Sequence, residues 1–582
     1  MALINIRREQ HPLFNSVVLD RIFQHFSVRN LKNVRLVCKF WDNIASPFLQ
    51  SGSKVNLIRG RGEMEARKSS FKNFIAYIET LSVEEIFFRN YHIEHWILNE
   101  RREKNLHRFW LKCGPTMKEL HLGNIIFYEV ETIRNVLYYW TPCLESLRIE
   151  DCLFYAVIQE NIPPKCEEYL HKEDFDEDYV FFDYYDHIDV EQLKNVERDP
   201  NVPCNLGLKS LHYEQWEDEV LPLAWEEVFA AFPNLKTLKL PAYISEDVIS
   251  DILNDASGLQ LEYLAFYKSR QGESTLTDGH LVQIRDFRKT LVHFEMCLGR
   301  NVSFHGLEVA ISEHSNALKT LNLYFPNSNS CTTFSTLKVY AIFPFKKISF
   351  PKLTTLTVSQ EILRGESFPQ CFQKMSALKT LKLWDASNEF NWEEPMDNIF
   401  EDDDNTSLSS SNSDQKVKPL LVSLKNFSCG YVVKSCEFYD HVFSQCPNLT
   451  VLKAPLNDEQ IRIVYKHLKL IEEMTVYDRY LTDQGITGNP LVLTEYTEWS
   501  PNCQRSFGYI GDLKKLCKFT LQYWKYDGIT DASVYHGFID VANLGFLRLT
   551  KTQISDTALH DLAAKSSLVT LITPKLSKGD AL

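Results

Sequence analysis

Residues 235–240 read Leu-Lys-Thr-Leu-Lys-Leu, residues 378–383 repeat the same six residues, and residues 318–323 read Leu-Lys-Thr-Leu-Asn-Leu. All three share the pattern apolar-x-x-apolar-x-apolar. Alternate side chains of a β-strand point to opposite faces, so Leu238 and Leu240 face an interior while Thr237, Lys239 and Pro241 face outward. We therefore predict a short strand with one buried face at each copy.

Looser copies of this pattern recur along the chain, and the median distance between successive starts is 27 residues. This period lies in the range of leucine-rich repeats, in which one repeat cannot bury its leucines alone and stacking makes a continuous core. We expect an α/β fold, a solenoid with a parallel sheet on its concave face and helices on its convex face. The looser copies start at Val83, Met117, Leu144, Leu208, Leu261, Leu291, Leu353, Leu424, Leu449, Ile471, Leu516, Leu544 and Leu568.

A second short motif, [Ile/Leu]-[Ser/Thr/Asn]-[Asp/Glu], follows several copies. The middle residue predicts a helix N-cap, and the acid favours the positive N-terminus of that helix. Each unit therefore reads as strand, loop, capped helix and return. The motif begins at Ile244, Leu276, Leu456, Leu481, Ile529 and Ile554.

The N-terminal stretch from Phe14 to Trp41 has a different pattern. Its apolar residues follow helical spacing twice, and Ser27 stands between the two runs where it can cap the second helix. A segment this short has too little interior to bury both apolar stripes, so part of this surface is expected to meet another protein.

This stretch resembles an F-box, the adaptor-binding module of substrate receptors in Skp–cullin–F-box ubiquitin ligases. The similarity covers Ile22–Leu31 and Val37–Trp41, and it departs at Phe14-Asn15, where the family usually has Leu-Pro; Asn15 can still cap the helix. With the repeats, the chain resembles an F-box protein with leucine-rich repeats. The resemblance implies three F-box helices that dock on a Skp-type adaptor through Phe14, Leu19, Ile22, Phe26, Leu31, Val34, Val37 and Trp41.

We expect three regions along the chain: an F-box at 10–50, a helical linker at 51–82, and a solenoid of about 16 repeats at 83–582. Gaps between copies predict insertions near 156–206, 393–420 and 484–512. Residues 167–197, in the first insertion, carry 12 Asp and Glu against two Lys, interleaved with aromatic residues. Such a run either recruits a basic segment or is a solvated loop.

Composition narrows the function. Residues 1–70 carry 12 Lys and Arg against five Asp and Glu, a net charge of +7. The whole chain has a net charge of −14, so residues 71–582 have a net charge of −21. This acidic body argues against nucleic acid as a ligand. No long apolar run or signal peptide predicts a membrane segment. Dispersed cysteines without a Cys-x-x-Cys pair predict a reducing compartment, cytosol or nucleus, and no metal site or cofactor.

No catalytic motif occurs in the sequence, and F-box proteins are non-catalytic receptors, so we expect binding rather than catalysis. Outward strand residues of a solenoid line the surface that binds partners. Tyr267, Tyr324, Trp384 and Tyr477 form the predicted substrate-contacting stripe, because large aromatic residues are enriched at interface hot spots. The predicted outward residues are Arg148, His212, Lys239, Tyr263, Tyr267, His293, Tyr324, Trp384, Lys453, Tyr477 and Arg548.

The expected function is therefore the substrate-recognition subunit of a ubiquitin ligase, with a Skp-type adaptor, a cullin scaffold and a protein substrate as partners. One alternative is a leucine-rich-repeat scaffold without a ligase role. Another is a receptor gated by a small molecule and an anionic cofactor, which needs clustered cations; the separation of Lys239, Lys453 and Arg548 in the sequence argues against it.

The repeat assignment makes one residue critical. Leu321 is predicted to be buried, and burial of a leucine contributes roughly 1.5–3 kcal/mol. Leu321→Asp is expected to unfold its neighbourhood. Limited proteolysis and thermal unfolding test this expectation, and a variant as resistant and as stable as the wild type would contradict the assignment.

Overall fold

The computed structural model divides the chain into two compact units, Met1–Thr275 with Asp286–Arg288 and Leu276–Arg285 with Lys289–Leu582. No helix in the described part of the chain is long and apolar enough to cross a bilayer. The structure describes residues 15–58, 74–82, 85–94, 97–98, 108–127, 133, 135–154, 207–214, 225–267, 274–287, 290–299, 301–324, 345, 347–359, 372–384, 419–430, 436–477, 481–488, 508–522, 528–549, 552–565 and 568–572.

Three helices form the N-terminal helical module of the first unit: α1 (Ser16–Phe23), α2 (Val28–Val34) and α3 (Lys39–Gly52). The Asn15 side chain accepts hydrogen bonds from the N–H groups of Val17 and Val18 at 3.0 and 3.3 Å, and Ser27 caps α2 by accepting from Asn30 at 3.3 Å. Both predicted caps are confirmed. The core of the module consists of Leu19, Phe23, Leu31, Ala45 and Leu49.

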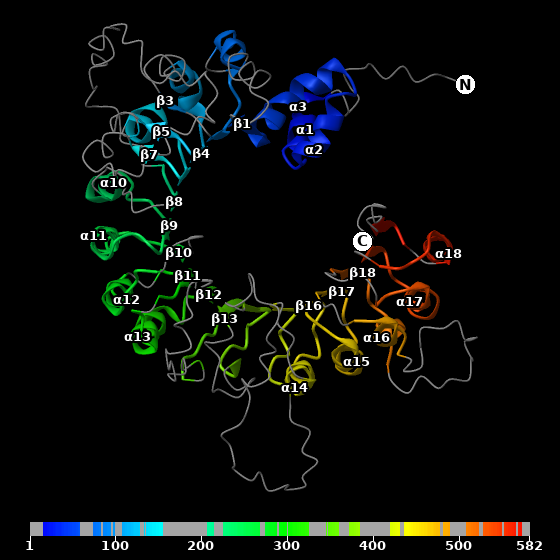
Figure 1. The fold of residues 1–582 in the computed structure, drawn as a ribbon. Coiled ribbons are helices and arrows are strands. Elements are labelled where there is room, and N and C mark those ends of the chain that lie inside the picture. The colour runs from blue at the N-terminus through cyan, green and yellow to red at the C-terminus, as the bar shows by residue number, and fades with distance from the viewer. Residues whose placement is uncertain are drawn as a thin grey trace, which may run out of the picture. The chain divides into compact units, whose positions relative to one another are not determined.

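The larger sheet of the first unit is parallel, and its strands pair in register in chain order (Figure 1). Its strands are β1 (Lys54–Ile58), β2 (Asn90–Glu94), β4 (Glu119–Gly123), β6 (Ser146–Glu150), β8 (Ser210–Glu214), β9 (Thr237–Pro241) and β10 (Tyr263–Tyr267). A second, short parallel sheet contains β3 (Ile97–Leu98), β5 (Ile126–Phe127) and β7 (Leu153–Phe154).

Helical segments connect these strands. They are the helices at residues 74–79 and 108–113, η4 (Gly114–Thr116), the π-helix η5 (Val136–Trp140), α10 (Trp225–Ala231) and α11 (Glu246–Ala256). The sheet begins at Lys54, whereas we expected it to begin at Val83 after a helical linker. Residues 51–82 therefore contain a strand as well as a helix: β1 pairs with β2, and its buried Leu57 lies beside Ile93.

The second unit continues the same architecture. Its parallel strands are β11 (His293–Cys297), β12 (Thr320–Tyr324), β13 (Thr355–Ser359), β14 (Thr380–Trp384), β15 (Asn426–Cys429), β16 (Val451–Ala454), β17 (Glu473–Val476), β18 (Lys518–Leu521), β19 (Phe546–Leu549) and β20 (Thr570–Ile572). Helices cover the other side of these strands (Figure 1): α12 (Asp278–Arg285), α13 (Phe304–His314), α14 (Cys436–Gln445), α15 (Asp458–His467), α16 (Asp483–Thr487), α17 (Asp531–His536) and α18 (Asp556–Lys565), with the short η8 (Ile510–Asp512) and η9 (Phe538–Asp540).

Buried leucines stack from strand to strand, as the repeat pattern predicts. Leu321 lies beside Leu356, which lies beside Leu381, and all three side chains are fully buried. Leu238 and Leu240 are buried as predicted, and Pro241, predicted to face outward, is buried too. One strand and one return per repeat around a shared apolar core is a leucine-rich-repeat fold.

The predicted insertions are only partly visible. Residues 156–206 and 393–418, with the acidic–aromatic run at 167–197, lie outside the described residues. Of the insertion near 484–512, the structure describes 484–488, the end of α16 and its C-cap, and 508–512, which includes η8.

The acidic residue of the [Ile/Leu]-[Ser/Thr/Asn]-[Asp/Glu] motif also accepts hydrogen bonds from the next repeat. Asp483 accepts hydrogen bonds from the N–H and hydroxyl of Thr530 and from those of Ser533, all in the next repeat. Asp458 does the same for Thr482, at 2.8 Å from its N–H and 2.6 Å from its hydroxyl. The same carboxylate contact joins Asp278 to the N–H of Ser303, and Asp531 to that of Ser555. The carboxylate therefore links consecutive repeats.

The capping residues behave mostly as predicted. Asn457, Thr482 and Thr530 accept hydrogen bonds from the first turns of α15, α16 and α17. Ser245 stands at the N-cap of α11 but its side chain makes no capping hydrogen bond, so this predicted cap is wrong. The place of Ser245 in the motif predicted the start of α11 but not a capping hydrogen bond from its hydroxyl.

We expect Asp483→Ala to destabilise the second unit by roughly 2–4 kcal/mol, because it leaves the half-buried donors of Thr530 and the buried donors of Ser533 without an acceptor. Urea unfolding measures the change. Asp251→Ala, at an exposed position of α11, is the control and should leave the unfolding midpoint unchanged. Equal midpoints for wild type and Asp483→Ala would contradict the linking role.

Candidate functional site

Two surfaces of the first unit stand out, and the first is the sheet face opposite the buried leucines. The middle outward residue of each strand lies beside that of the next, because the strands are parallel and in register. These residues make up the histidine–arginine row: His92, His121, Arg148, His212 and Lys239. Two residues further along each strand lies the glutamate row, which consists of Glu94, Gly123, Glu150 and Glu214.

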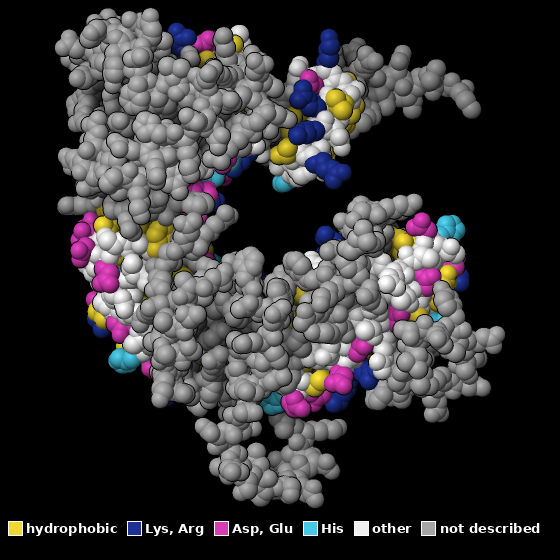
Figure 2. Space-filling view, in the orientation of Figure 1, with side chains coloured by type: hydrophobic (Ala, Val, Ile, Leu, Met, Phe, Trp, Pro, Cys, Tyr) yellow, Lys and Arg dark blue, Asp and Glu magenta, His cyan; other side chains and the backbone are white. Residues whose placement is uncertain are grey.

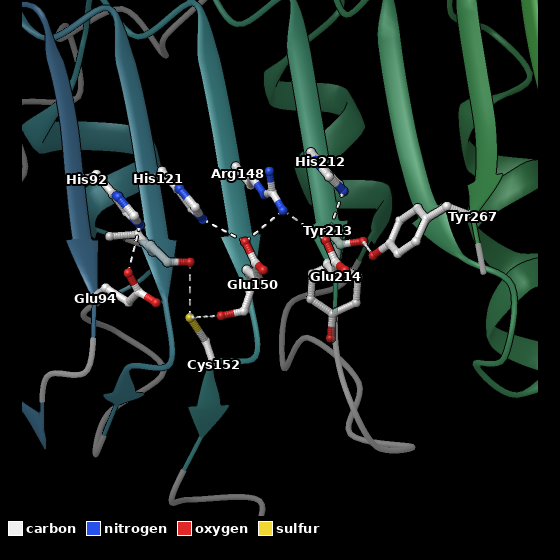
Figure 3. Close-up of polar contacts among 11 residues, drawn as sticks. His92, Glu94, His121, Arg148, Glu150, Cys152, His212, Tyr213, Glu214 and Tyr267 are labelled. Carbon is white, nitrogen blue, oxygen red and sulfur yellow. Dashed lines mark hydrogen bonds and ion pairs between the residues drawn. The ribbon is translucent and has the colours of Figure 1, made fainter. Parts of the chain in front are cut away.

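The two rows are joined by ion pairs and hydrogen bonds (Figure 3). His121 Nε2 lies 2.8 Å from Glu150 Oε2, and Arg148 Nη2 lies 2.7 Å from the same oxygen. Arg148 Nη2 also lies 3.1 Å from Glu214 Oε2, so one guanidinium holds two carboxylates. His212 Nε2 approaches Glu214 Oε2 at 3.4 Å. This network fixes the side chains of three neighbouring strands.

At the first strands of the face, His92 and His121 stack with their rings parallel and their centroids 4.0 Å apart. His92 Nε2 lies 3.3 Å from Glu94 Oε2. Burial, together with the neighbouring His121 and Lys54, lowers the pKa of His92 from 6.5 to about 4, against the opposite effect of Glu94 and Glu150. Burial likewise lowers the pKa of His121. Both imidazoles are therefore uncharged at neutral pH.

The carboxylate of Glu214 responds in the opposite direction. Burial raises its pKa, but the hydrogen bond and charge of His212 and the charge of Arg148 outweigh burial, so the net pKa is lowered. Glu214 is thus ionised at neutral pH and pairs with Arg148. The Arg148–Glu214 pair is therefore charged at neutral pH, in contrast to the two stacked histidines.

Cys152, which follows β6, is also part of this region, and it is fully buried. Its thiol donates to the carbonyls of Glu150 and Leu122 at 3.5 and 3.6 Å (Figure 3). Burial raises the pKa of the Cys152 thiol to about 12, so it is a poor nucleophile. The cysteine packs the turn after the strand. Among the described residues, no group of three or more His, Cys, Asp or Glu side chains is arranged to hold a metal ion.

Of the predicted substrate-contacting residues, Tyr267 lies in the first unit and Tyr324, Trp384 and Tyr477 lie in the second. The Tyr267 hydroxyl donates to the Tyr213 carbonyl at 2.5 Å, and burial raises its pKa. Tyr324 donates to Glu295 at 3.1 Å in the second unit. Trp384 ends β14, with a side chain outside the described residues, and Tyr477 directly follows β17. The two tyrosine hydroxyls already have partners within the sheet.

The second surface is the outside of the N-terminal helical module. Several apolar side chains there are exposed: Ile22 by 39%, Val37 by 62%, Val17 by 64% and Leu36 by 81%, with Val18 also exposed. Figure 2 shows hydrophobic side chains together with Lys and Arg on the visible face of this module. We call Val17, Val18, Ile22, Leu36 and Val37 the exposed apolar patch.

Exposed Lys and Arg residues lie close to the patch residues in the sequence. They are Arg21, Arg29, Lys32, Arg35 and Lys39, against two acidic residues, Asp20 and Asp42, in residues 15–52. Arg35 Nε lies 3.0 Å from Asp42 Oδ1, so that pair is partly neutralised. The module therefore presents an apolar and basic surface.

The predicted adaptor-binding residues divide into surface and core. Ile22 and Val37 are exposed, whereas Leu19 and Leu31 are buried in the module. Phe26, Val34 and Trp41 are partly buried and pack against that core; the Trp41 ring lies 5.7 Å from that of Phe23. Phe14 lies outside the described residues. The helical spacing therefore placed both core residues and surface residues in one predicted set.

The sequence reasoning missed Val17, Val18 and Leu36 in the patch, and His92, His121, Glu94, Glu150 and Glu214 on the sheet. The sequence nevertheless contains features that indicate residues of both sets. Val17 and Val18 are apolar residues outside the buried stripe of α1, and apolar residues on the polar side of an amphipathic helix indicate a contact surface. His121, Glu150 and Glu214 occupy outward positions of predicted strands. His92 and Glu94 lie on β2, which begins at Asn90, beyond the copy predicted from Val83.

No protein-family model matches the sequence, and no curated protein matches it either. Solved structures do resemble the fold. A TLR13–ssRNA13 complex is similar over 82% of this chain, with 13% identity and a TM-score of 0.34, and the similar region spans only 52% of the TLR13 chain. A yeast Rad7–Elc1 complex is similar over 72% of this chain and 86% of its own, with 12% identity and a TM-score of 0.30.

Internalin C2 from Listeria monocytogenes is similar over 48% of this chain and 87% of its own, with 13% identity and a TM-score of 0.21. Because these three structures are only 12–13% identical and have TM-scores of 0.34 or less, we base the fold assignment on the strand register and the buried leucines.

The stacked histidines predict a pH dependence of stability. Because folding lowers the pKa of His92 from 6.5 to about 4, the unfolded chain binds more protons in this window, and the free energy of unfolding falls as the pH is lowered from 6.5 towards 4. His92→Gln should reduce this fall. Urea unfolding at several pH values measures it, with His441→Gln at an exposed site as control. An identical pH profile for His92→Gln and wild type would contradict the assignment.

Proposed function

We propose that this protein is the substrate-recognition subunit of a Skp–cullin–F-box ubiquitin ligase. The N-terminal helical module binds the Skp-type adaptor, which in turn binds the cullin, and the repeat array binds a protein substrate. The protein itself performs no bond chemistry. It acts in the cytosol or nucleus, where the ligase and its substrates meet.

The observation that carries the proposal is the exposed apolar patch. Val37 and Leu36 are exposed by 62% and 81%, and Val17 and Ile22 of α1 are exposed by 64% and 39%. Exposed apolar side chains of this kind, on a module with its own buried core, mark a protein contact. The F-box resemblance at Ile22–Leu31 and Val37–Trp41 lies on the same helices.

The repeat array supports the second half of the proposal. Its outward strand residues form extended polar rows, and in solenoids this is the surface that contacts partners. A receptor that holds a substrate and an adaptor at once raises the local concentration of acceptor lysines near the conjugating enzyme. Binding without catalysis is then sufficient for ubiquitin transfer.

The adaptor contact is tested with the double variant Ile22→Asp/Val37→Asp. Both side chains are exposed, so the charges enter the contact surface and not the core. We expect binding of a purified Skp-type adaptor to fall by at least about a hundredfold, because two buried, unpaired carboxylates each oppose association. Surface plasmon resonance measures the affinity.

Val569→Asp is the matched control, because Val569 is exposed by 87% and lies in the second unit. It should bind the adaptor as the wild type does. Circular dichroism and thermal unfolding verify that all variants fold alike. If the folded double variant retains full adaptor affinity, or if the wild type binds no Skp-type adaptor, the proposed function is wrong.

A further inference from the structure

A second polar row, in the second unit, differs in charge from the row in the first. The middle outward residues of β12 to β19 are neighbours in register across eight strands. Not one of these eight is acidic, although the chain has 77 Asp and Glu against 63 Lys and Arg. The next residue of the row, Glu295 on β11, accepts hydrogen bonds from Asn322 and Tyr324 and lies three strands from Lys382. They make up the cationic row: Asn322, Thr357, Lys382, Ser428, Lys453, Thr475, Thr520 and Arg548.

The three cations of this row project into solvent. Lys382, Lys453 and Arg548 are exposed, whereas the other members are half-buried or buried. None of the three forms an ion pair or hydrogen bond through its side chain with another described residue. In the first unit, by contrast, Arg148 is held by both Glu150 and Glu214. Among the described residues, no carboxylate neutralises the positive charge of these three side chains.

A neighbouring row lies two residues earlier on each of these strands, and it carries no unpaired carboxylate. Thr355, Thr380 and Asn426 are uncharged, and Asn426 donates to the Thr380 hydroxyl at 3.2 Å. The one carboxylate of that row between β12 and β19, Glu473, lies 3.3 Å from Lys518 Nζ and is neutralised by it. Nothing in these two rows competes for the three exposed cations.

We propose that the cationic row binds an extended acidic peptide segment of the protein substrate, one rich in Asp or Glu. The inference deepens the proposed function, since it names the chemistry of the substrate, and it rests on the array being the substrate-binding part. Carboxylates of the peptide pair with Lys382, Lys453 and Arg548. The hydroxyls of Ser428 and Thr475, which lie between cations in the row, can hydrogen-bond to the peptide.

The spacing of the cations fits an extended chain. Neighbouring strands lie about 4.8 Å apart, so Lys382 and Lys453, two strands apart, are separated by about 10 Å. Lys453 and Arg548, three strands apart, are separated by about 14 Å. An extended peptide advances about 3.3 Å per residue, which predicts acidic residues about three and then four positions apart.

Other anions fit this row less well. A small polyanion needs converging cations, and these three are separated by two and three strands. Single-stranded nucleic acid is held by aromatic side chains that stack on its bases, and the cationic row has no aromatic member. A peptide carboxylate needs only the separated cations and hydroxyls that the row offers.

The test uses the full chain without adaptor and a fluorescent Gly/Ser peptide with glutamates at i, i+3 and i+7. The triple variant Lys382→Gln/Lys453→Gln/Arg548→Gln should bind it roughly tenfold more weakly than the wild type, because three partly exposed ion pairs are lost. Lys352→Gln/Lys514→Gln/Lys565→Gln removes the same charge from exposed positions outside the row and should bind like the wild type. Fluorescence anisotropy measures all three.

Two further probes sharpen the result. Replacing the glutamates of the peptide by glutamine should abolish binding, and added salt should weaken binding of the acidic peptide. Equal binding by the wild type and the row variant, equal binding of the glutamine peptide, or binding of single-stranded RNA without binding of the peptide would overturn the inference.

The adaptor assay separates this inference from the proposed function. The row variant should retain the adaptor affinity of the wild type, because the exposed apolar patch is unchanged. If the wild type binds the adaptor but not the acidic peptide, the inference about the cationic row is wrong and the proposed function stands. If the wild type binds the acidic peptide but no adaptor, the proposed function is wrong and the inference about the cationic row stands.

Discussion

Burial of alternate leucines decides where every other side chain of a strand can go. Once Leu321 and Leu323 of β12 point into the core, Asn322 between them must point out, because successive strand residues face opposite sides. Parallel pairing in register then places each outward residue beside its counterpart in the next repeat. The polar rows are therefore a consequence of the apolar core.

This constraint turns residues far apart in the sequence into neighbours. Arg148 and Glu214 are separated by 66 positions yet form an ion pair, because their strands are adjacent. In the first unit, the rows pair histidine and arginine with glutamate. In the second unit, Lys382, Lys453 and Arg548 lack such carboxylates among the described residues. The same fold thus offers two surfaces of different charge, and the choice of one residue per repeat sets the difference.

The leucine pattern was sufficient to predict most strands and their buried faces, and the short motif most helix caps, because these depend on neighbours within one repeat. Both missed β1, and β2 begins later than the copy predicted from Val83. The other features that they missed depend on other repeats. The motif placed Asp483 at a helix N-terminus, but its partners Thr530 and Ser533 lie 47 and 50 positions away. Leu19 and Ile22 share one apolar stripe, and only the packing of α2 and α3 buries the first and leaves the second exposed.

The two kinds of surface follow from the size of the core behind them. In the array, the inward strand leucines such as Leu321, Leu356 and Leu381 are fully buried between neighbouring repeats, so many of its outward positions can be polar and the fold still be stable. The helical module has only three short helices, and it leaves Leu36 and Val37 exposed after its own core is filled. An apolar contact favours a lasting complex, whereas separated cations favour exchangeable, salt-sensitive binding. Such a division suits a receptor that stays with one partner and releases another.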